Sequence, residues 1–348
     1  MPRIDSSVNQ ILVTVEVVAS RNGKTKACNT CKRWSRLSHS NGNAKKIIFT
    51  GLDNSGKSSI ILALKKSIAK ISQLKPTVGV ERETFTFLDY TIHAHDLGGQ
   101  KKYLIKYLKQ PDKFFEETDV CIYVIDIQDI GRFNETLSYF KDLLDKYAEM
   151  ELQPLLYIFL HKAEKVLLES DSAGEKTIEM LSDQLAEINN ERYYMEFKVT
   201  TVYDIWSISS SFASIMQKIY PPSELIEKAM KELADNLNAE VAVLFDENVL
   251  MLANFLRDEQ YNDLVQYTAP YFFTFKNFET KIKGDIKTDK MRLELDQFEF
   301  LFIENKDHAP RLYLLLIGKS GTLPGLDKVG EIAQQLPELF LQLGVNLS

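Results

Sequence analysis

The chain is poor in cysteine, and it has no long uninterrupted apolar run. Only three of its 348 residues are cysteines, which is too few for a disulfide framework and is typical of a reducing compartment. No stretch approaches the ~20 consecutive apolar residues that a membrane-spanning helix needs, and the first residues lack the apolar core of a signal peptide. These absences predict a cytoplasmic protein.

Sequence signals for a lipid anchor are also missing. Position 2 is Pro2, where N-myristoylation requires glycine, and residues 344–348 contain no cysteine for prenylation. Membrane contact is therefore expected only indirectly or through the basic N-terminal segment, which would place the protein at most at the periphery of a membrane.

Positive charge exceeds negative charge at the N-terminus, whereas the rest of the chain is acidic. Residues 1–46 carry nine Lys or Arg and two acidic residues, a net charge of +7, whereas the whole chain carries −7. The remainder therefore carries −14, and an acidic body of this kind does not suggest a nucleic-acid surface. The basic segment is expected to be a solvated tail, with contact to anionic lipid or RNA as the alternative.

Two of the three cysteines, Cys28 and Cys31, lie close together in this extension. A structural zinc site needs four ligands; His39 is the nearest further candidate, and the sequence has no second such pair. We therefore expect no metal site and interpret residues 1–44 as a basic, disordered extension. The third cysteine, Cys121, lies in a strongly apolar run and is predicted to be a buried thiol.

A regular pattern of strands and helices begins at Lys45 and continues to about residue 220. The expected strands lie at 46–51, 83–88, 91–97, 119–127, 154–161 and 194–202, and the expected helices lie near 57–71, 130–150, 173–190 and 205–220. Alternation of this kind indicates parallel βαβ units, hence a doubly wound, mostly parallel six-stranded α/β sheet. A tight turn at Asp89-Tyr90 predicts one antiparallel hairpin within it.

A second domain follows the helix-breaking pair Pro221-Pro222. Its elements are expected in the order α-β-β-α-β-β-β-α, with helices at 223–238, 258–275 and 326–343 and strands at 241–247, 249–255, 291–296, 298–304 and 311–318. This order predicts an antiparallel sheet with helices packed on it, an α+β domain over residues 223–348. Its strands carry apolar residues on both faces, more than three helices easily cover, so we expect a partner chain to cover part of the sheet.

The strongest motif in the sequence is a phosphate-binding loop. The segment from Gly51 to Ser58 reads GLDNSGKS, which matches GxxxxGK[ST], and it lies between a predicted strand and a predicted helix as the motif requires. Backbone N–H groups and the helix N-terminus would hold the β-phosphate, Lys57 would bridge the β- and γ-phosphates, and Ser58 would bind Mg²⁺. The residues predicted to contact nucleotide here are Gly51, Asp53, Asn54, Ser55, Gly56, Lys57, Ser58 and Ser59.

Two further segments complete a phosphate-sensing site. Asp96 begins the segment DLGGQ at the end of a predicted strand and is expected to hold Mg²⁺, Gly99 to donate its N–H to the γ-phosphate, and Gln100 to orient the attacking water. Between the two motifs, Thr77 of the segment PTVG would complete the Mg²⁺ shell only when the γ-phosphate is present. One phosphate would then order two loops, which is the physical basis of a switch.

These motifs resemble those of small GTPases of the Ras superfamily. The segments GLDNSGKSS, PTVG and DLGGQ, together with Val124-Ile125-Asp126 and Gly131-Arg132-Phe133, are similar to Arf-family GTPases in order and spacing. The segment FNETLSYF at 133–140, the pair His161-Lys162 and the C-terminal element order resemble Rag/Gtr GTPases and their roadblock domain. The resemblance covers about residues 45–348 and implies a small GTPase domain at 45–222 followed by a roadblock/longin-like dimerisation domain.

The resemblance also locates a base-recognition box that departs from the usual Asn-Lys-x-Asp. Here His161 and Lys162 begin the box and Glu164 ends it. A carboxylate at the last position accepts two N–H groups of guanine and repels adenine, so guanine preference is expected although Glu164 is one methylene longer than Asp. Lys162 would lay its stem on the base, His161 would donate like Asn, and Thr201 and Val202 would support the base.

The function expected from these residues is a GTP-hydrolysing switch that uses GTP/GDP and Mg²⁺. No arginine precedes Thr77 in the segment Gln73–Pro76, so hydrolysis is expected to be slow until an activating protein supplies charge in trans. The expected partners are activating and exchange proteins and a second chain, in a homodimer or a heterodimer with a related GTPase. The alternatives are a nucleotide-binding scaffold subunit with little or no hydrolysis and a general P-loop ATPase.

Overall fold

The structure of the protein is a computed structural model that describes most of the chain after the N-terminal segment. The described residues are 44–65, 75–87, 90–164, 173–219, 223–246, 251–262, 264–265, 268–269, 272, 290–305 and 311–342. The predicted extension at 1–44 lies outside them except for Ala44, and so do Cys28 and Cys31. The chain divides into two compact units between residues 211 and 212.

The first unit is built on a six-stranded sheet in the order β2-β3-β1-β4-β5-β6. Its strands are β1 (Ala44–Thr50), β2 (Val80–Phe87), β3 (Tyr90–Leu97), β4 (Val120–Asp126), β5 (Leu155–His161) and β6 (Met195–Thr200). All neighbouring pairs are parallel except the hairpin β2–β3. Every residue of β5 is buried, as expected for a central strand of a sheet that is covered on both faces.

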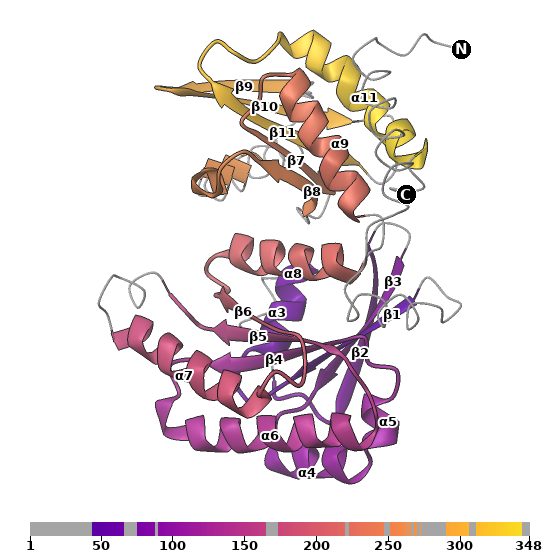
Figure 1. The fold of residues 1–348 in the computed structure, drawn as a ribbon, viewed down its shortest axis with the longest axis vertical. Coiled ribbons are helices and arrows are strands. Elements are labelled where there is room, and N and C mark those ends of the chain that lie inside the picture. Colours follow the sequence, from indigo (N-terminus) through magenta and orange to yellow (C-terminus); the bar gives the residue numbers. More distant parts are fainter. Residues whose placement is uncertain are drawn as a thin grey trace. The chain divides into compact units, whose positions relative to one another are not determined.

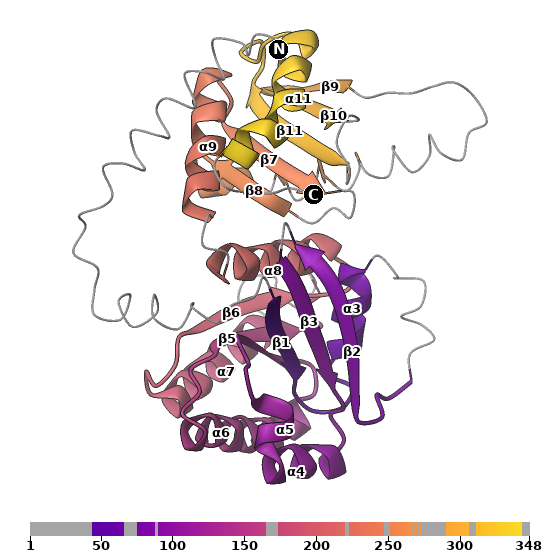
Figure 2. The same ribbon diagram turned by 90° about the vertical axis from the view of Figure 1, so that its right-hand side faces the viewer.

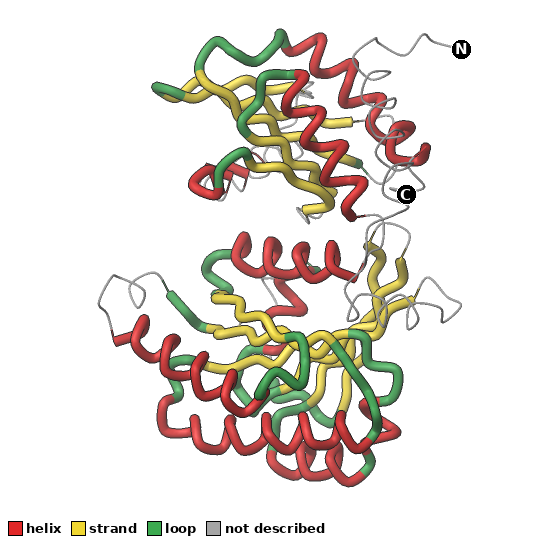
Figure 3. The backbone as a smooth tube through the Cα atoms, in the orientation of Figure 1, coloured by secondary structure: helices red, strands yellow, loops and turns green. Residues whose placement is uncertain are grey.

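Helices cover both faces of this sheet, as Figures 1 and 3 show. The helices of the unit are α3 (Lys57–Leu64), α4 (Lys101–Lys109), α5 (Pro111–Phe115), α6 (Phe133–Glu149) and α7 (Ala173–Asn189), with a 3-10 turn η3 (Ile130–Arg132) before α6. Helix α8 (Ile205–Ile219) begins in this unit and continues past its boundary. Residues of α4, α5, α6 and α7 share one apolar core with β1, β4 and β5, while α3 lies on the opposite face (Figure 1). Cys121 is buried in that core, and burial raises the pKa of its thiol to about 12.

The predicted fold class is confirmed, and two helices were not predicted. The six strands and the antiparallel hairpin lie where the sequence indicates. The sequence pattern predicts no helix over residues 101–115, but these residues form α4 and α5. Leu104 and Tyr107 of α4 and both phenylalanines of α5 are buried, so packing on the sheet accounts for these two short helices. Among the described helices, none is long and apolar enough to cross a membrane.

The second unit is an antiparallel sheet in the order β8-β7-β11-β10-β9. Its strands are β7 (Val241–Asp246), β8 (Met251–Leu256), β9 (Lys290–Leu295), β10 (Phe298–Asn305) and β11 (Leu312–Lys319), and its long helices are α9 (Ser223–Asn236) and α11 (Leu326–Gln342). Helix α9 packs on β7 and β8, and α11 packs on β10 (Figures 1 and 2). The order of α9, the five strands and α11 agrees with the sequence prediction. The helix predicted at 258–275 lies partly outside the described residues, which show a 3-10 turn η5 (Glu259–Tyr261) and single helical residues there.

Most of the apolar surface of this sheet is buried within the chain itself. Phe300 and Phe302 of β10 are almost fully buried, and the Phe272 ring stacks on Phe302 with ring centroids 4.2 Å apart. The exposed apolar residues of the sheet are Leu293 and Leu295 of β9, with exposed fractions of 39% and 52%. The surface that a partner could cover is therefore narrower than the sequence suggested and lies at the β9 edge.

Candidate functional site

The predicted phosphate loop connects β1 to α3 at the carboxyl end of the sheet. The loop turns sharply: φ is +133° at Gly51, +60° at Asn54 and +101° at Gly56. A side chain at Gly56 would collide with the imidazole of His161, because a Cβ there would lie 2.3 Å from its Cδ2 atom. Glycine at this position therefore permits both the left-handed turn and the close approach of the phosphate loop to the base-recognition box.

The segment DLGGQ packs directly against the phosphate loop. The Asp53 backbone N–H donates to the Gly99 carbonyl over 3.0 Å, and a Cβ on Gly99 would lie 2.2 Å from the Asp53 nitrogen. The Gly98 N–H and the Tyr107 hydroxyl both donate to the Gly79 carbonyl, each over 2.8 Å. The segment that contains Thr77 is thus tied to the loop that contains Gly99 and to helix α4.

Three predicted Mg²⁺ ligands converge at this place. The Thr77 hydroxyl lies 2.9 Å from the Ser58 hydroxyl and donates to Asp96 Oδ2 over 3.2 Å, and Ser58 also donates to Asp96. The second Asp96 oxygen, Oδ1, is buried without a hydrogen-bond partner among the described residues. Burial raises the pKa of this carboxyl, against the hydrogen bonds from Ser58 and Thr77 and the charge of Lys57.

This oxygen cluster fits a magnesium ion. Mg²⁺ prefers hydroxyl, carboxylate and water oxygens and takes few protein ligands, and an ion near Asp96 would satisfy the orphaned carboxylate oxygen. Clusters of three or more His, Cys, Asp or Glu side chains, which would suggest a transition metal, are absent from the described part of the chain. The residues present therefore fit the ion that the sequence predicts.

Lys57 is buried beneath the phosphate loop. Its ammonium donates to the Gly51 carbonyl over 3.0 Å, to the Leu52 carbonyl over 2.7 Å and to the Ser55 hydroxyl over 3.3 Å. Burial lowers the pKa of the ammonium to about 8, although Asp96 and Asp53 act in the opposite direction. An anionic group bound at the loop would supply the missing negative charge and favour the protonated form.

A cavity of about 200 Å³ brings the phosphate-contact residues together with Thr77 and Gln100. It is lined by Asp53, Asn54, Gly56, Lys57, Ser58, Ser59, Lys75, Pro76, Thr77, Gly99 and Gln100. Gln100 immediately precedes α4, and its carbonyl accepts hydrogen bonds from the backbone N–H groups of Tyr103 and Leu104 in the first turn of the helix. Gly51 and Ser55 shape the loop without lining this cavity, and the base-recognition residues lie outside it.

The base-recognition residues form a second group at the ends of β5 and β6. The buried His161 ring lies 2.9 Å from the Thr200 hydroxyl through Nδ1, and burial followed by the charge of Lys162 lowers its pKa to about 4. The neutral imidazole can therefore serve as a single donor at pH 7. The Lys162 ammonium pairs with Asp126 Oδ2 at 2.7 Å, and Thr201 and Val202 follow β6 in a turn next to this box.

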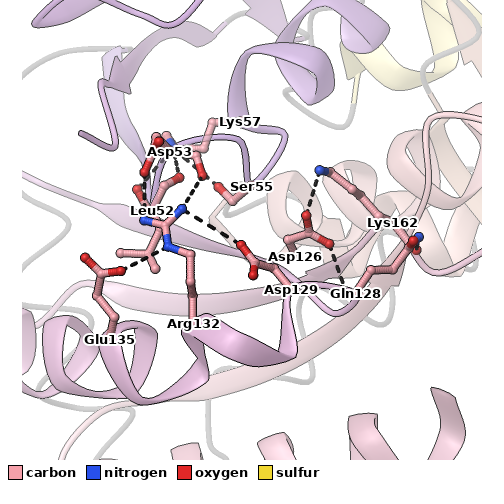
Figure 4. A network of polar contacts seen from close by, with 11 residues as sticks. Leu52, Asp53, Ser55, Lys57, Asp126, Gln128, Asp129, Arg132, Glu135 and Lys162 are labelled. Carbon is pink, nitrogen blue, oxygen red and sulfur yellow. Dashed lines mark hydrogen bonds and ion pairs between the residues drawn. The ribbon is translucent and has the colours of Figure 1, made fainter. Parts of the chain in front are cut away.

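Side chains near the start of α6 and the end of β4 also reach the site, although sequence reasoning assigned them no role. Figure 4 shows Arg132 pointing to the phosphate loop, where it pairs with Asp53 Oδ1 at 2.7 Å and with Glu135 at 3.0 Å. It also shows Gln128 beside Asp126 and Lys162. Arg132 entered the sequence argument only as part of a resembling segment, so its contact with Asp53 had no local signal.

Comparison with known proteins places these features in one family. A family model described as the Gtr1/RagA G protein conserved region matches residues 46–271. The chain is 24% identical to the GTP-binding protein GTR1 of Saccharomyces cerevisiae over 270 residues, 72% of this chain and 86% of that protein.

Arf-like proteins match over shorter stretches. The chain is 37% identical to ADP-ribosylation factor-like protein 2 of Dictyostelium discoideum over 102 residues, which is 29% of this chain and 52% of that protein. Among solved structures, the Arl6 small GTPase of Trypanosoma brucei with a bound nucleotide analogue aligns at 20% identity with a TM-score of 0.40, over 51% of this chain and 97% of that one. The match with the Dictyostelium protein therefore spans only about half of that protein's length.

Proposed function

Since this chain belongs to the Gtr1/RagA family of GTP-binding proteins, a family of GTPases, we propose that it is a guanine-nucleotide switch that hydrolyses GTP slowly. Residues 45–222 would form the switching domain, residues 223–348 the dimerisation domain, and residues 1–44 a basic extension. Partner proteins would distinguish the GTP-bound form from the GDP-bound form through the segments around Thr77 and Gln100.

One observation carries this proposal: the convergence of Thr77, Ser58 and Asp96 beside Lys57. The Thr77 hydroxyl reaches the oxygens of two other elements, Ser58 of α3 and Asp96 of β3. A γ-phosphate with Mg²⁺ would strengthen this convergence, and its loss would remove the reason for Thr77 to stay there. That difference between two nucleotide states is what a switch requires.

Each residue of the site has a proposed role. Lys57 would neutralise the β- and γ-phosphates, Gly99 would donate its N–H to the γ-phosphate, and Gln100 would orient the attacking water. Mg²⁺ held by Ser58, Thr77 and Asp96 would neutralise phosphate charge when bound. The base would lie against Lys162 with Glu164 accepting its N–H groups, supported by His161, Thr201 and Val202.

The second candidate function is a nucleotide-binding scaffold subunit with little or no hydrolysis. Single-turnover phosphate release from GTP by the wild-type protein distinguishes the two. We expect slow release, on the order of 10⁻⁴ to 10⁻³ s⁻¹ without an activating protein, which stops when Mg²⁺ is chelated. Tight GTP binding with no phosphate release would favour the scaffold.

We further propose that the protein pairs through the β9 edge of its second unit. The neighbouring leucines Leu293 and Leu295 lie on the face that also carries Phe298 and Phe300, as the β9–β10 register shows. Exposed apolar side chains on an edge strand invite a second chain, and a stable pair would bury at least ~1,000 Å² in total. The partner would be a second copy or a related GTPase.

Light scattering on the full chain at tens of micromolar tests this pairing. A dimer is expected, and replacing both leucines by glutamate should convert it to a monomer with unchanged nucleotide affinity. The matched control is Leu341→Glu, because Leu341 is an exposed leucine on α11 of the same unit. A wild-type monomer would exclude the homodimer and leave the heterodimer, which co-purification with a related chain would test.

A further inference from the structure

The base-recognition box ends in Glu164, whose carboxylate lies one methylene farther from the backbone than that of an aspartate. The extra rotatable bond must be ordered when the carboxylate binds a base, which weakens binding unless something else holds it. Among the described residues, Gln128 contacts this carboxylate, and it lies just beyond the end of β4. Its contacts explain how a glutamate can serve at this position.

We propose that Gln128 is a positioning residue for base selection, which holds the Glu164 carboxylate where it meets the Watson–Crick edge of guanine. The inference rests on the proposed function, since it assigns Glu164 to the base. It adds to that function a residue that determines the specificity of the site, from an element outside the base-recognition box.

The geometry of Gln128 suits this role. Its side-chain nitrogen Nε2 donates to the Lys162 carbonyl over 2.7 Å and also to the Glu164 carboxylate oxygen Oε2. A primary amide has two N–H donors, so both N–H groups of the Gln128 side chain are engaged by acceptors of the base-recognition box. The Gln128 backbone N–H donates to Asp126 Oδ1 over 3.0 Å, which fixes the residue that carries the amide.

Three consecutive residues at and just beyond the end of β4 contact the base-recognition box, and Gln128 is the last of them. The Ile127 N–H donates to the His161 carbonyl over 3.2 Å, and Asp126 pairs with the Lys162 ammonium (Figure 4). Lys162 itself has φ +62°, a left-handed conformation that is rare outside glycine and needs surrounding contacts to persist. Asp126, Ile127 and Gln128 provide those contacts.

The remaining acceptor capacity of Glu164 matches guanine. A carboxylate has about four lone-pair positions on two oxygens, and Gln128 uses one of them on Oε2. With respect to the described residues, Oε1 and the rest of Oε2 are left for the two neighbouring N–H groups of guanine. Hypoxanthine presents only the ring N–H, and adenine presents an acceptor there. A Glu164 carboxylate that is positioned by Gln128 should therefore favour GDP over both IDP and ADP. Without that hydrogen bond, the preference for GDP should be smaller.

Gln128 is exposed, so its replacement should not disturb the core. The test compares Gln128→Leu, Glu164→Asp and the double variant, with the exposed Gln184→Leu on α7 as the matched control. Affinities for GDP, IDP and ADP are measured by displacement of a fluorescent guanine nucleotide, and the thermal unfolding midpoint of each variant is recorded. The nucleotide affinities report base selection, and the midpoints report folding.

Gln128→Leu is expected to weaken GDP binding on the order of tenfold, as for a hydrogen bond to a charged group at a partly hydrated site. The GDP-to-IDP preference should fall with it, while ADP affinity and the unfolding midpoint stay the same. In the Glu164→Asp background the shorter carboxylate no longer reaches the amide, so adding Gln128→Leu should change GDP affinity by less than about twofold.

The inference is overturned if Gln128→Leu binds GDP as the wild type does. It is equally overturned if the variant loses GDP, IDP and ADP affinity alike, or if the loss is as large in the aspartate background, because either result would indicate a general structural role. These outcomes are separate from failure of the proposed function, which would be seen in the wild-type protein as equal affinity for GDP and ADP.

Discussion

Lys57→Ala is expected to weaken GTP binding by about 100-fold or more. The ammonium is buried and its three N–H groups are held by acceptors of the phosphate loop, and in the nucleotide complex it would exchange some of these acceptors for phosphate oxygens. Losing hydrogen bonds from a cation to two phosphate groups costs on the order of 3 to 6 kcal/mol at ~1.5–3 kcal/mol each. Calorimetric titration with a non-hydrolysable GTP analogue measures the loss.

The pH dependence of binding gives this prediction a second readout. Burial lowers the pKa of Lys57 to about 8, so raising the pH through 8 removes the cation from the free protein. Wild-type affinity for the analogue should begin to fall above that pH, and the variant should lack this fall. Lys141→Ala serves as a control, because Lys141 is an exposed lysine on α6. Unchanged affinity in Lys57→Ala would contradict the phosphate-loop assignment.

Gln100→Leu is expected to slow GTP hydrolysis on the order of 100-fold while GTP affinity changes by less than about twofold. Gln100 lines the cavity beside Thr77 and Gly99, where its amide can orient a water in the transition state without holding the ground state. Losing one positioned group of this kind typically costs a factor of about 10² to 10³. Leucine keeps the size of the side chain and removes its polar atoms.

Single-turnover phosphate release with protein in excess measures this effect. Gln110→Leu is the matched control, because Gln110 is an exposed glutamine at the other end of α4. An unchanged rate in Gln100→Leu would show that another group directs the water or that the observed release is not catalysed by this site. The scaffold function would then be favoured.

Sequence reasoning predicts the parts of the proposed site that are local in the chain. The phosphate loop from Gly51 to Ser58 and the segment from Asp96 to Gln100 each carry their chemistry within a few residues, and their order fixes which strand ends they occupy. The fold class followed for the same reason, since alternation of apolar runs with helical patterns is a local signal.

Contacts between distant residues could not be obtained in this way. Arg132 meets Asp53 across 79 positions, and Gln128 meets Glu164 across 36. In each case the two residues carry no pattern that marks them as partners. Such pairs depend on strand order and register, which a single sequence specifies only through the completed fold.

Packing also decided where the sequence was misleading. Residues 101–115 are rich in lysine and had no assigned helix, yet burial of Leu104 and Tyr107 stabilises α4. The apolar residues of β10 suggested a surface that only a partner could cover, but Phe272 of the same chain covers Phe302. On the described strands of this sheet, the exposed large apolar side chains are Leu293 and Leu295, and the proposed interface is therefore placed at β9.

The central claim is that the site selects guanine, and the most direct test is the affinity of the nucleotide-free wild-type protein for GDP and for ADP, measured side by side with Mg²⁺ present. We expect GDP to bind at least ~100-fold more tightly, because Glu164 accepts the N–H groups of guanine and repels the acceptor nitrogen of adenine. Equal affinities, or tighter binding of ADP, would contradict the account.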